Sequence, residues 1–96
     1  MIKHTVTFKF KDSITTSEKE IFFKALANLK SILGVQKFEI LNRVYKDNNS
    51  EYAIFMEFEN KETYQAYTQN EVHLDFIKNY WLKFVETFKE MDFDII

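Results

Sequence analysis

The sequence predicts a small α+β domain of the ferredoxin-like type, in which two helices cover one face of an antiparallel sheet. Its length of 96 residues suits a single hydrophobic core, so we treat residues 1–96 as one domain. Hydrophobic residues make up 46% of the chain and aromatic residues 18%, which excludes a disordered segment. Stretches of period-two and helical hydrophobic periodicity follow one another in the order βαββαβ.

The first half begins with strict alternation, which predicts a strand over residues 2–10. Its apolar face carries Ile2, His4, Val6, Phe8 and Phe10. A helix is expected from Ser17, because Ser17 and Glu20 have the spacing of a capping box. Gly34 is expected to end this helix, since glycine readily adopts the left-handed conformation that closes helices.

Two further alternating stretches, residues 35–45 and 52–58, flank the turn-forming segment 46–51 and predict a β-hairpin. The sheet face turned away from the helices should carry apolar side chains among charged neighbours, namely Leu41, Tyr45, Phe55 and Phe88. Such a face needs a cover, and a second copy of the chain is the simplest one, so we expect a homodimer.

The last third of the chain predicts a helical region and a closing strand. Asn60 is expected to cap a helical region over residues 61–83, broken near 68–70. Alternation then predicts a strand over residues 87–95.

Composition excludes several classes of function. A net charge of −2 argues against nucleic acid as a partner. The chain has no Cys, which excludes thiolate chemistry and favours a cytoplasmic location, and no apolar run indicates a signal peptide or membrane span. A single Gly excludes phosphate-binding loops, and two widely spaced His do not form a metal motif, so we expect neither a cofactor nor a metal. Asp92 and Asp94 are expected to solvate the last strand.

Two histidines and a tyrosine are the candidates for chemistry. His73 lies in the apolar stripe of the second helical region and titrates near neutral pH, which suits a general base. His4 lies on the apolar face of the first strand and therefore needs a buried partner. Tyr67 could donate a hydrogen bond to a developing oxyanion, whereas Tyr64 is expected to pack beside it. A purely structural role remains open for each of them.

The opening residues 2–11, the helix exit at residues 29–35, and the spacing of Tyr67, His73 and Phe76 resemble the stress-responsive A/B barrel domain (Dabb) family over essentially the whole chain. The resemblance implies a homodimeric α+β barrel with a pocket between sheet and helices. It also implies kinship with plant polyketide cyclases, which use a helix histidine as base and a tyrosine six residues before it as hydrogen-bond donor. These positions correspond to His73 and Tyr67, and His4 corresponds to the first-strand histidine.

Two positions depart from the cyclase pattern. The usual His-Pro-x-His reads Asn70-Glu71-Val72-His73, and a third-strand pocket histidine corresponds to Tyr52. Besides the catalytic pair His73 and Tyr67, we expect a ligand to contact His4, Phe8, Tyr52, Phe76, Tyr80 and Trp81.

Three functions remain open at this stage, and with them the question of whether the protein is an enzyme. The first is a dimeric module that binds a hydrophobic small molecule without changing it. The second is a cofactor-free cyclase or isomerase with His73 as base and Tyr67 as oxyanion donor. The third is a cofactor-free monooxygenase of the antibiotic-biosynthesis type, which shares the barrel architecture.

Overall fold

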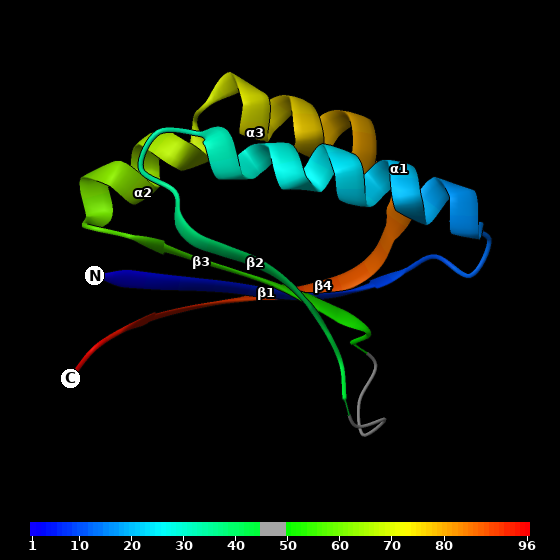
Figure 1. Cartoon of the computed structure of the whole chain (residues 1–96), viewed down its shortest axis with the longest axis horizontal. Coiled ribbons are helices and arrows are strands. Elements are labelled where there is room, and N and C mark those ends of the chain that lie inside the picture. The colour runs from blue at the N-terminus through cyan, green and yellow to red at the C-terminus, as the bar shows by residue number, and fades with distance from the viewer. Residues whose placement is uncertain (45–49) are drawn as a thin grey trace.

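A computed structural model describes residues 1–44 and 50–96 of the chain and confirms the ferredoxin-like α+β fold. One layer is a sheet and the other is made of helices (Figure 1). The elements in chain order are β1 (Ile2–Phe10), α1 (Thr16–Ala27), η1 (Asn28–Ser31), β2 (Gln36–Asn42), β3 (Tyr52–Phe58), α2 (Lys61–Thr68), α3 (Glu71–Phe76), η2 (Ile77–Trp81), α4 (Leu82–Phe84) and β4 (Val85–Asp94). Within the described ranges, no helix is long and apolar enough to cross a membrane.

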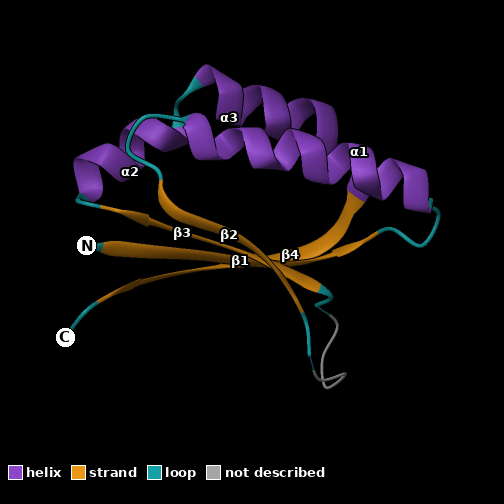
Figure 2. Ribbon diagram, viewed as in Figure 1, coloured by secondary structure: helices purple, strands orange, loops and turns teal. Residues whose placement is uncertain are grey.

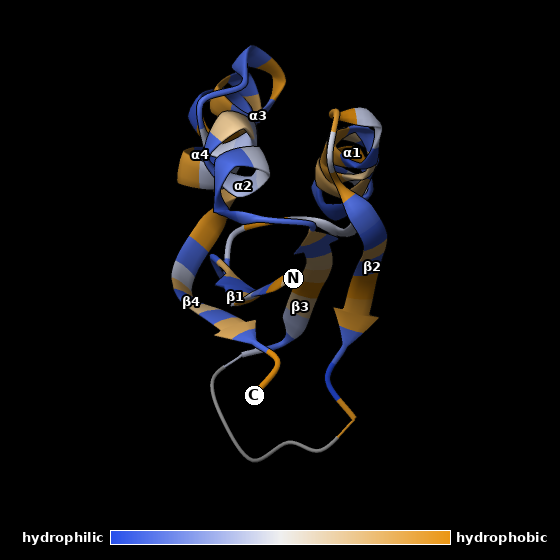
Figure 3. Ribbon diagram, turned by 90° about the vertical axis from the view of Figure 1, so that its left-hand side faces the viewer, coloured by the Kyte–Doolittle hydropathy of each residue, from blue (hydrophilic) through white to orange (hydrophobic). Residues whose placement is uncertain are grey.

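The sheet has the strand order β2-β3-β1-β4, and all neighbouring strands are antiparallel (Figure 2). The register of the strands determines which side chains lie on the same face of the sheet. His4 of β1 lies between Met56 of β3 and Asp92 of β4, and all three side chains therefore point to the same side. All helices cover that side, with α1 above the β2 edge and α2 to α4 above the β4 edge (Figure 3).

The hydrophobic core fills the space between these layers. Alternate residues of β1 and β3 supply its floor, and the inner faces of α1 and of the later helices supply its roof. The largest fully buried side chains are Phe8, Phe22, Leu26, Met56 and Phe58.

The first helix begins earlier than the sequence predicts. Thr15 is the N-cap, and it forms a reciprocal capping box with Glu18. The expected start at Ser17 was wrong. The segment contains two overlapping Ser/Thr-x-x-Glu patterns, and the upstream one, Thr15 with Glu18, caps the N-terminus of the helix.

The same helix also ends before Gly34. It changes to a 3₁₀ turn, η1, and the chain is already extended at Ile32. Gly34 instead turns the chain into β2 with φ +93, and a Cβ at this position would collide with the side chain of Thr63. The glycine is therefore needed for a close approach between the β2 entry and α2.

The second helical region is broken where the sequence predicts. Asn60 caps α2 by accepting a hydrogen bond from the Thr63 amide, and Asn70 caps α3 by accepting one from the Val72 amide. After α3 the helix widens into the π-helical segment η2, which directs Trp81 into the core.

The face away from the helices is partly as predicted. Leu41 and Phe55 do lie there, because they pair with residues of that face across β2 and β3. Phe88 was assigned wrongly: it pairs with Phe8, so it lies on the helix-covered face. The outward apolar residues of β4 are Met91 and Phe93, which pair with Thr5 and Lys3 of β1. Tyr45 lies outside the described residues.

Candidate functional site

A cavity of about 240 Å³ lies between the sheet and the later helices. Most of its wall is apolar, and four polar side chains interrupt that wall: His4, Tyr67, His73 and Glu90. The apolar lining consists of Val6, Leu29, Ile54, Met56, Phe76, Ile77, Trp81, Leu82 and Phe88. The arrangement is typical of a site that binds an apolar molecule and orients it through few polar contacts.

His73 is held by a backbone hydrogen bond at the start of α3. Its Nδ1 lies 3.1 Å from the carbonyl oxygen of Thr68, the last residue of α2. A carbonyl can only accept, so Nδ1 carries the proton and Nε2 keeps its lone pair. Burial lowers the pKa of His73, although the bond to Thr68 opposes this effect. The ring is therefore a neutral base at neutral pH.

Tyr67 lies in the last turn of α2, directly beside this base. It is only 3% exposed, and its ring centroid is 4.5 Å from that of His73. Burial, and secondarily the charge of Glu90, raise the pKa of Tyr67, so the phenol stays protonated. The hydroxyl has no hydrogen-bond partner among the described residues and is free to donate to a ligand.

His4 belongs to a three-residue network at the same end of the sheet. Its Nδ1 lies 2.6 Å from Oδ1 of Asp92 and 3.0 Å from the hydroxyl of Tyr64. The Tyr64 hydroxyl in turn donates to Oδ2 of Asp92 at 2.9 Å. Because Nδ1 is engaged by this network, Nε2 is the His4 nitrogen available to a ligand. Burial, followed by the bond to Asp92, raises the pKa of Tyr64.

The structure brings five of the eight predicted site residues together. His4, Tyr67, His73, Phe76 and Trp81 all line the cavity. This placement agrees with a pocket on the helix-covered side of the sheet.

The other three predicted residues do not line the cavity. Phe8 is completely buried under Trp81, because its strand position points into the packed core. Tyr52 pairs with Phe8 and packs against the aromatic residues beneath α1. Tyr80 stacks on the outer side of Phe76 and borders a separate groove between α1 and α3. Aromatic periodicity identified these side chains but could not separate core from cavity.

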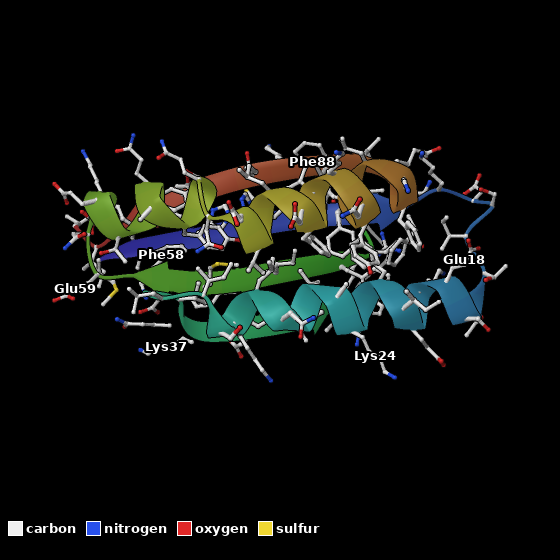
Figure 4. All side chains as sticks on the ribbon, turned by 90° about the horizontal axis from the view of Figure 1, so that it is seen from above. Glu18, Lys24, Lys37, Phe58, Glu59 and Phe88 are labelled. Carbon is white, nitrogen blue, oxygen red and sulfur yellow. The ribbon has the colours of Figure 1, made fainter. Side chains whose placement is uncertain are left out.

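Phe88 and Glu90 are among the lining residues that the sequence did not predict as site residues. The sequence also did not predict Asp92 as the partner of His4. Phe88 lies on β4 beside the later helices (Figure 4), with its ring 5.5 Å from that of Trp81. Asp92 was expected to solvate the strand, but it is the hydrogen-bond partner of His4 and Tyr64. The signal lay in the pairing of β4 with β1, which places Phe88, Glu90 and Asp92 opposite Phe8, Val6 and His4.

No three His, Asp or Glu side chains in the described part of the chain come together as a metal-binding group. The polar chemistry of the cavity therefore consists of two imidazoles, a phenol and a carboxylate.

Comparison with known proteins identifies the family. The model of the stress responsive A/B barrel domain, Dabb, matches residues 2–95. The chain belongs to the Dabb family. It is 33% identical over 89 residues to olivetolic acid cyclase from Cannabis sativa, covering 85% of this chain and 88% of the cyclase.

Solved structures share the fold of this chain. A Dabb protein with a ferredoxin-like fold from Mesorhizobium loti superposes with a TM-score of 0.92 at 30% identity, covering 99% of this chain and 96% of the other. Hydroxynitrile lyase from Passiflora edulis has a TM-score of 0.89 at 13% identity, with 99% and 93% covered. A dimeric ferredoxin-like protein from Thermobifida fusca has a TM-score of 0.84 at 16% identity, with 98% and 90% covered.

Proposed function

We propose that this Dabb protein binds a small, largely apolar carbonyl compound in its cavity and removes a proton from the carbon beside the carbonyl. His73 is the general base and Tyr67 donates a hydrogen bond to the enolate oxygen. Such a step underlies cyclisation and isomerisation, and it needs no cofactor because the two side chains supply base and oxyanion donor.

The state of His73 carries this proposal. Its Nδ1 proton is committed to the Thr68 carbonyl, so Nε2 can accept a proton, and its lowered pKa keeps that nitrogen unprotonated at neutral pH. The adjacent Tyr67 keeps its proton because burial raises its pKa. A neutral base and a protonated donor in one apolar cavity are what enolate formation requires.

Identity of 33% to olivetolic acid cyclase supports an enzymatic role of this kind. The likeness to hydroxynitrile lyase, at 13% identity, supports the fold alone. The ligand is proposed to be apolar over most of its surface because nine of the cavity's lining residues are apolar.

Deuterium exchange tests the chemical step without knowledge of the natural substrate. Alkyl- and aryl-substituted 1,3-diketones in heavy water should gain deuterium between their carbonyls faster with the protein than without it. His73→Ala should lower the protein-dependent rate about 10²- to 10⁴-fold. Asn79→Ala is the matched control, because Asn79 borders the outer groove instead of the cavity. An unchanged rate in His73→Ala would remove His73 from the mechanism.

A binding module that leaves its ligand unchanged is the second candidate. It is favoured by the two departures from the cyclase pattern: Asn70 caps α3, and Tyr52 packs in the core. Under this alternative, diketones would bind but wild-type protein would not accelerate exchange. No observation favours the monooxygenase alternative.

We also propose that the protein is a homodimer that buries the uncovered sheet face. Leu41 and Phe93 on this face are 41% and 55% exposed. Phe55 lies on a strand between theirs, and the Nζ of Lys3 lies over its ring, 5.8 Å from the centroid. A stable interface needs roughly 1,000 Å² or more of buried surface. The likeness to the dimeric ferredoxin-like protein from Thermobifida fusca supports the proposal of a dimer.

Light scattering coupled to size exclusion tests the dimer. The wild type should elute as a dimer at micromolar concentration, and Leu41→Asp should shift it to monomer, because an unpaired charge would be buried. Leu33→Asp is the control, since Leu33 is 90% exposed in the turn before β2. A monomeric wild type would refute the proposal.

A further inference from the structure

Glu90 is the one carboxylate among the residues that line the cavity. It lies in β4 opposite Val6, whose side chain is part of the cavity floor, so both project toward the helices. On the same strand and face, Phe88 lies before it and Asp92 after it. A charged side chain therefore stands in an otherwise mostly apolar wall, beside the two histidines and Tyr67.

The carboxylate of Glu90 lacks a partner within the described ranges, unlike the carboxylates of Asp92, Glu86 and Glu57 in the same sheet. Asp92 binds His4, Glu86 lies 3.7 Å from Lys9, and Glu57 lies 2.9 Å from Lys3. For Glu90 the same part of the structure shows neither a hydrogen bond nor an ion pair. Its negative charge acts at longer range on Tyr64, Tyr67 and His73. Its acceptor capacity is thus available to a bound molecule.

We propose that Glu90 determines the ligand class of this cavity: it accepts a hydrogen bond from a hydroxyl group of an uncharged aromatic or enolic ligand and excludes ligands that carry a carboxylate. The proposal deepens the proposed function and rests on it only in requiring that the cavity binds a ligand.

The exclusion follows from electrostatics. A ligand carboxylate inside this mostly apolar cavity would lie near a second negative charge, that of Glu90, and like charges placed together are unfavourable. A hydroxyl, in contrast, would make a charge-assisted hydrogen bond, which is stronger than a neutral one.

The same charge orients the ligand. An enolate that forms during proton removal is disfavoured near Glu90 and favoured near the Tyr67 hydroxyl. The carbonyl of the ligand is therefore directed to Tyr67 and a hydroxyl, where present, to Glu90. This pairing distinguishes the cavity from one that is built around an aromatic acid.

Three matched probes test the proposal: 4-propylphenol, 4-propylbenzoate and propylbenzene, which carry a donor, a carboxylate and no polar group. Trp81 is the single tryptophan of the chain and lines the cavity, so its indole N–H signal in an NMR titration reports occupancy. At neutral pH the phenol should bind the wild type at least about tenfold more tightly than the benzoate. In Glu90→Gln the benzoate should gain about tenfold, the phenol should weaken a few-fold, and propylbenzene should change little.

Glu86→Gln is the matched control. Glu86 lies on the same strand and its removal changes net charge equally, but it does not line the cavity. It should leave the ratio of phenol to benzoate affinity unchanged. An equal ratio in wild type and Glu90→Gln, or the same shift in Glu86→Gln, would overturn the role of Glu90. If propylbenzene binds but the ratio of phenol to benzoate affinity is the same in wild type and Glu90→Gln, only the role of Glu90 is refuted. If no probe binds to wild type or to Glu90→Gln, the cavity itself is refuted as a ligand site.

Discussion

The layer between sheet and helices has two ends that differ in kind. Under α1, aromatic rings pack solidly: the centroid of Phe22 lies 4.9 Å from that of Phe10 and 5.7 Å from that of Phe8. Under α2 and α3, the layer is hollow and lined by titratable groups such as His4 and His73. One strand, β1, serves both ends, because its inward positions carry His4 in the first half of the strand and Phe8 and Phe10 in the second half. Stability and chemistry are thus divided along a single strand.

The packed end should dominate stability. Phe22 is fully buried, so Phe22→Ala should lower the free energy of unfolding by about 3–5 kcal/mol. Phe88→Ala removes the same ring at the cavity, where Phe88 is 55% exposed, and should cost less than about 1.5 kcal/mol. Urea unfolding of both variants measures the difference. Equal costs would show that the two ends are not energetically distinct.

The hollow end should dominate activity. Tyr67→Phe keeps the buried ring but removes the oxyanion donor, so we expect up to about a 10²-fold loss in the exchange rate of diketones, a smaller loss than for His73→Ala. Its free energy of unfolding should change by less than about 1 kcal/mol, because the hydroxyl makes no hydrogen bond among the described residues. Full exchange activity in Tyr67→Phe would mean that the Tyr67 hydroxyl has no catalytic role and that the residue serves only in packing.

The network of His4, Tyr64 and Asp92 lies at the hollow end but should also contribute to stability. Asp92→Asn weakens a short hydrogen bond to a histidine that is only 4% exposed, and it should cost about 1–3 kcal/mol of stability. Asp94→Asn is the control, since Asp94 lies 3.5 Å from the N-terminal amino group and its side chain is 68% exposed, where ion pairs contribute about 0–1 kcal/mol. Its Oδ1 also accepts a hydrogen bond from the adjacent Ile95 amide, which an asparagine oxygen can still accept. Thermal unfolding of the two variants compares them. Equal effects would mean that His4 does not depend on Asp92.

Much of the fold could be predicted from the sequence, because hydrophobic periodicity is a local signal. The alternation of β1 and the break between α2 and α3 are both present as expected. In β4 the same signal misled: Met91 and Phe93 point away from the helices, while Glu90 and Asp92 point toward them. A strand that turns charged side chains toward a cavity reverses the usual pattern, and only its pairing with β1 reveals which face of the strand points inward.

The candidate site was predictable in part for a related reason. Histidine and tyrosine are uncommon at apolar positions, so the sequence alone identifies His4, Tyr67 and His73 as candidates. Tyr64 and Asp92 complete the His4 network from distant parts of the chain, so no sequence spacing connects them. Phe8 and Trp81 both occupy apolar stripes, yet only Trp81 lines the cavity. That distinction depends on how the helices sit on the sheet.

The titration of His73 gives the finest test of the contrast between the two ends. Burial lowers its pKa below the ordinary 6.5, so an NMR titration of its ring protons should have a midpoint below that value. Between this midpoint and pH 6.5 the unfolded chain binds more protons at this residue than the folded one. The contribution of His73 to stability is therefore fully present above pH 6.5, is lost as the pH falls through this window, and should be absent in His73→Ala. The polar groups that act on the ring are the Thr68 carbonyl, His4 and Glu90, and the ring of Tyr67 lies against it. Because the charge of Glu90 favours the protonated ring, Glu90→Gln should lower the midpoint further, whereas Glu86→Gln should not. A midpoint above pH 6.5 in the wild type would mean that the ring is charged near neutral pH, and His73 could not then be the resting general base.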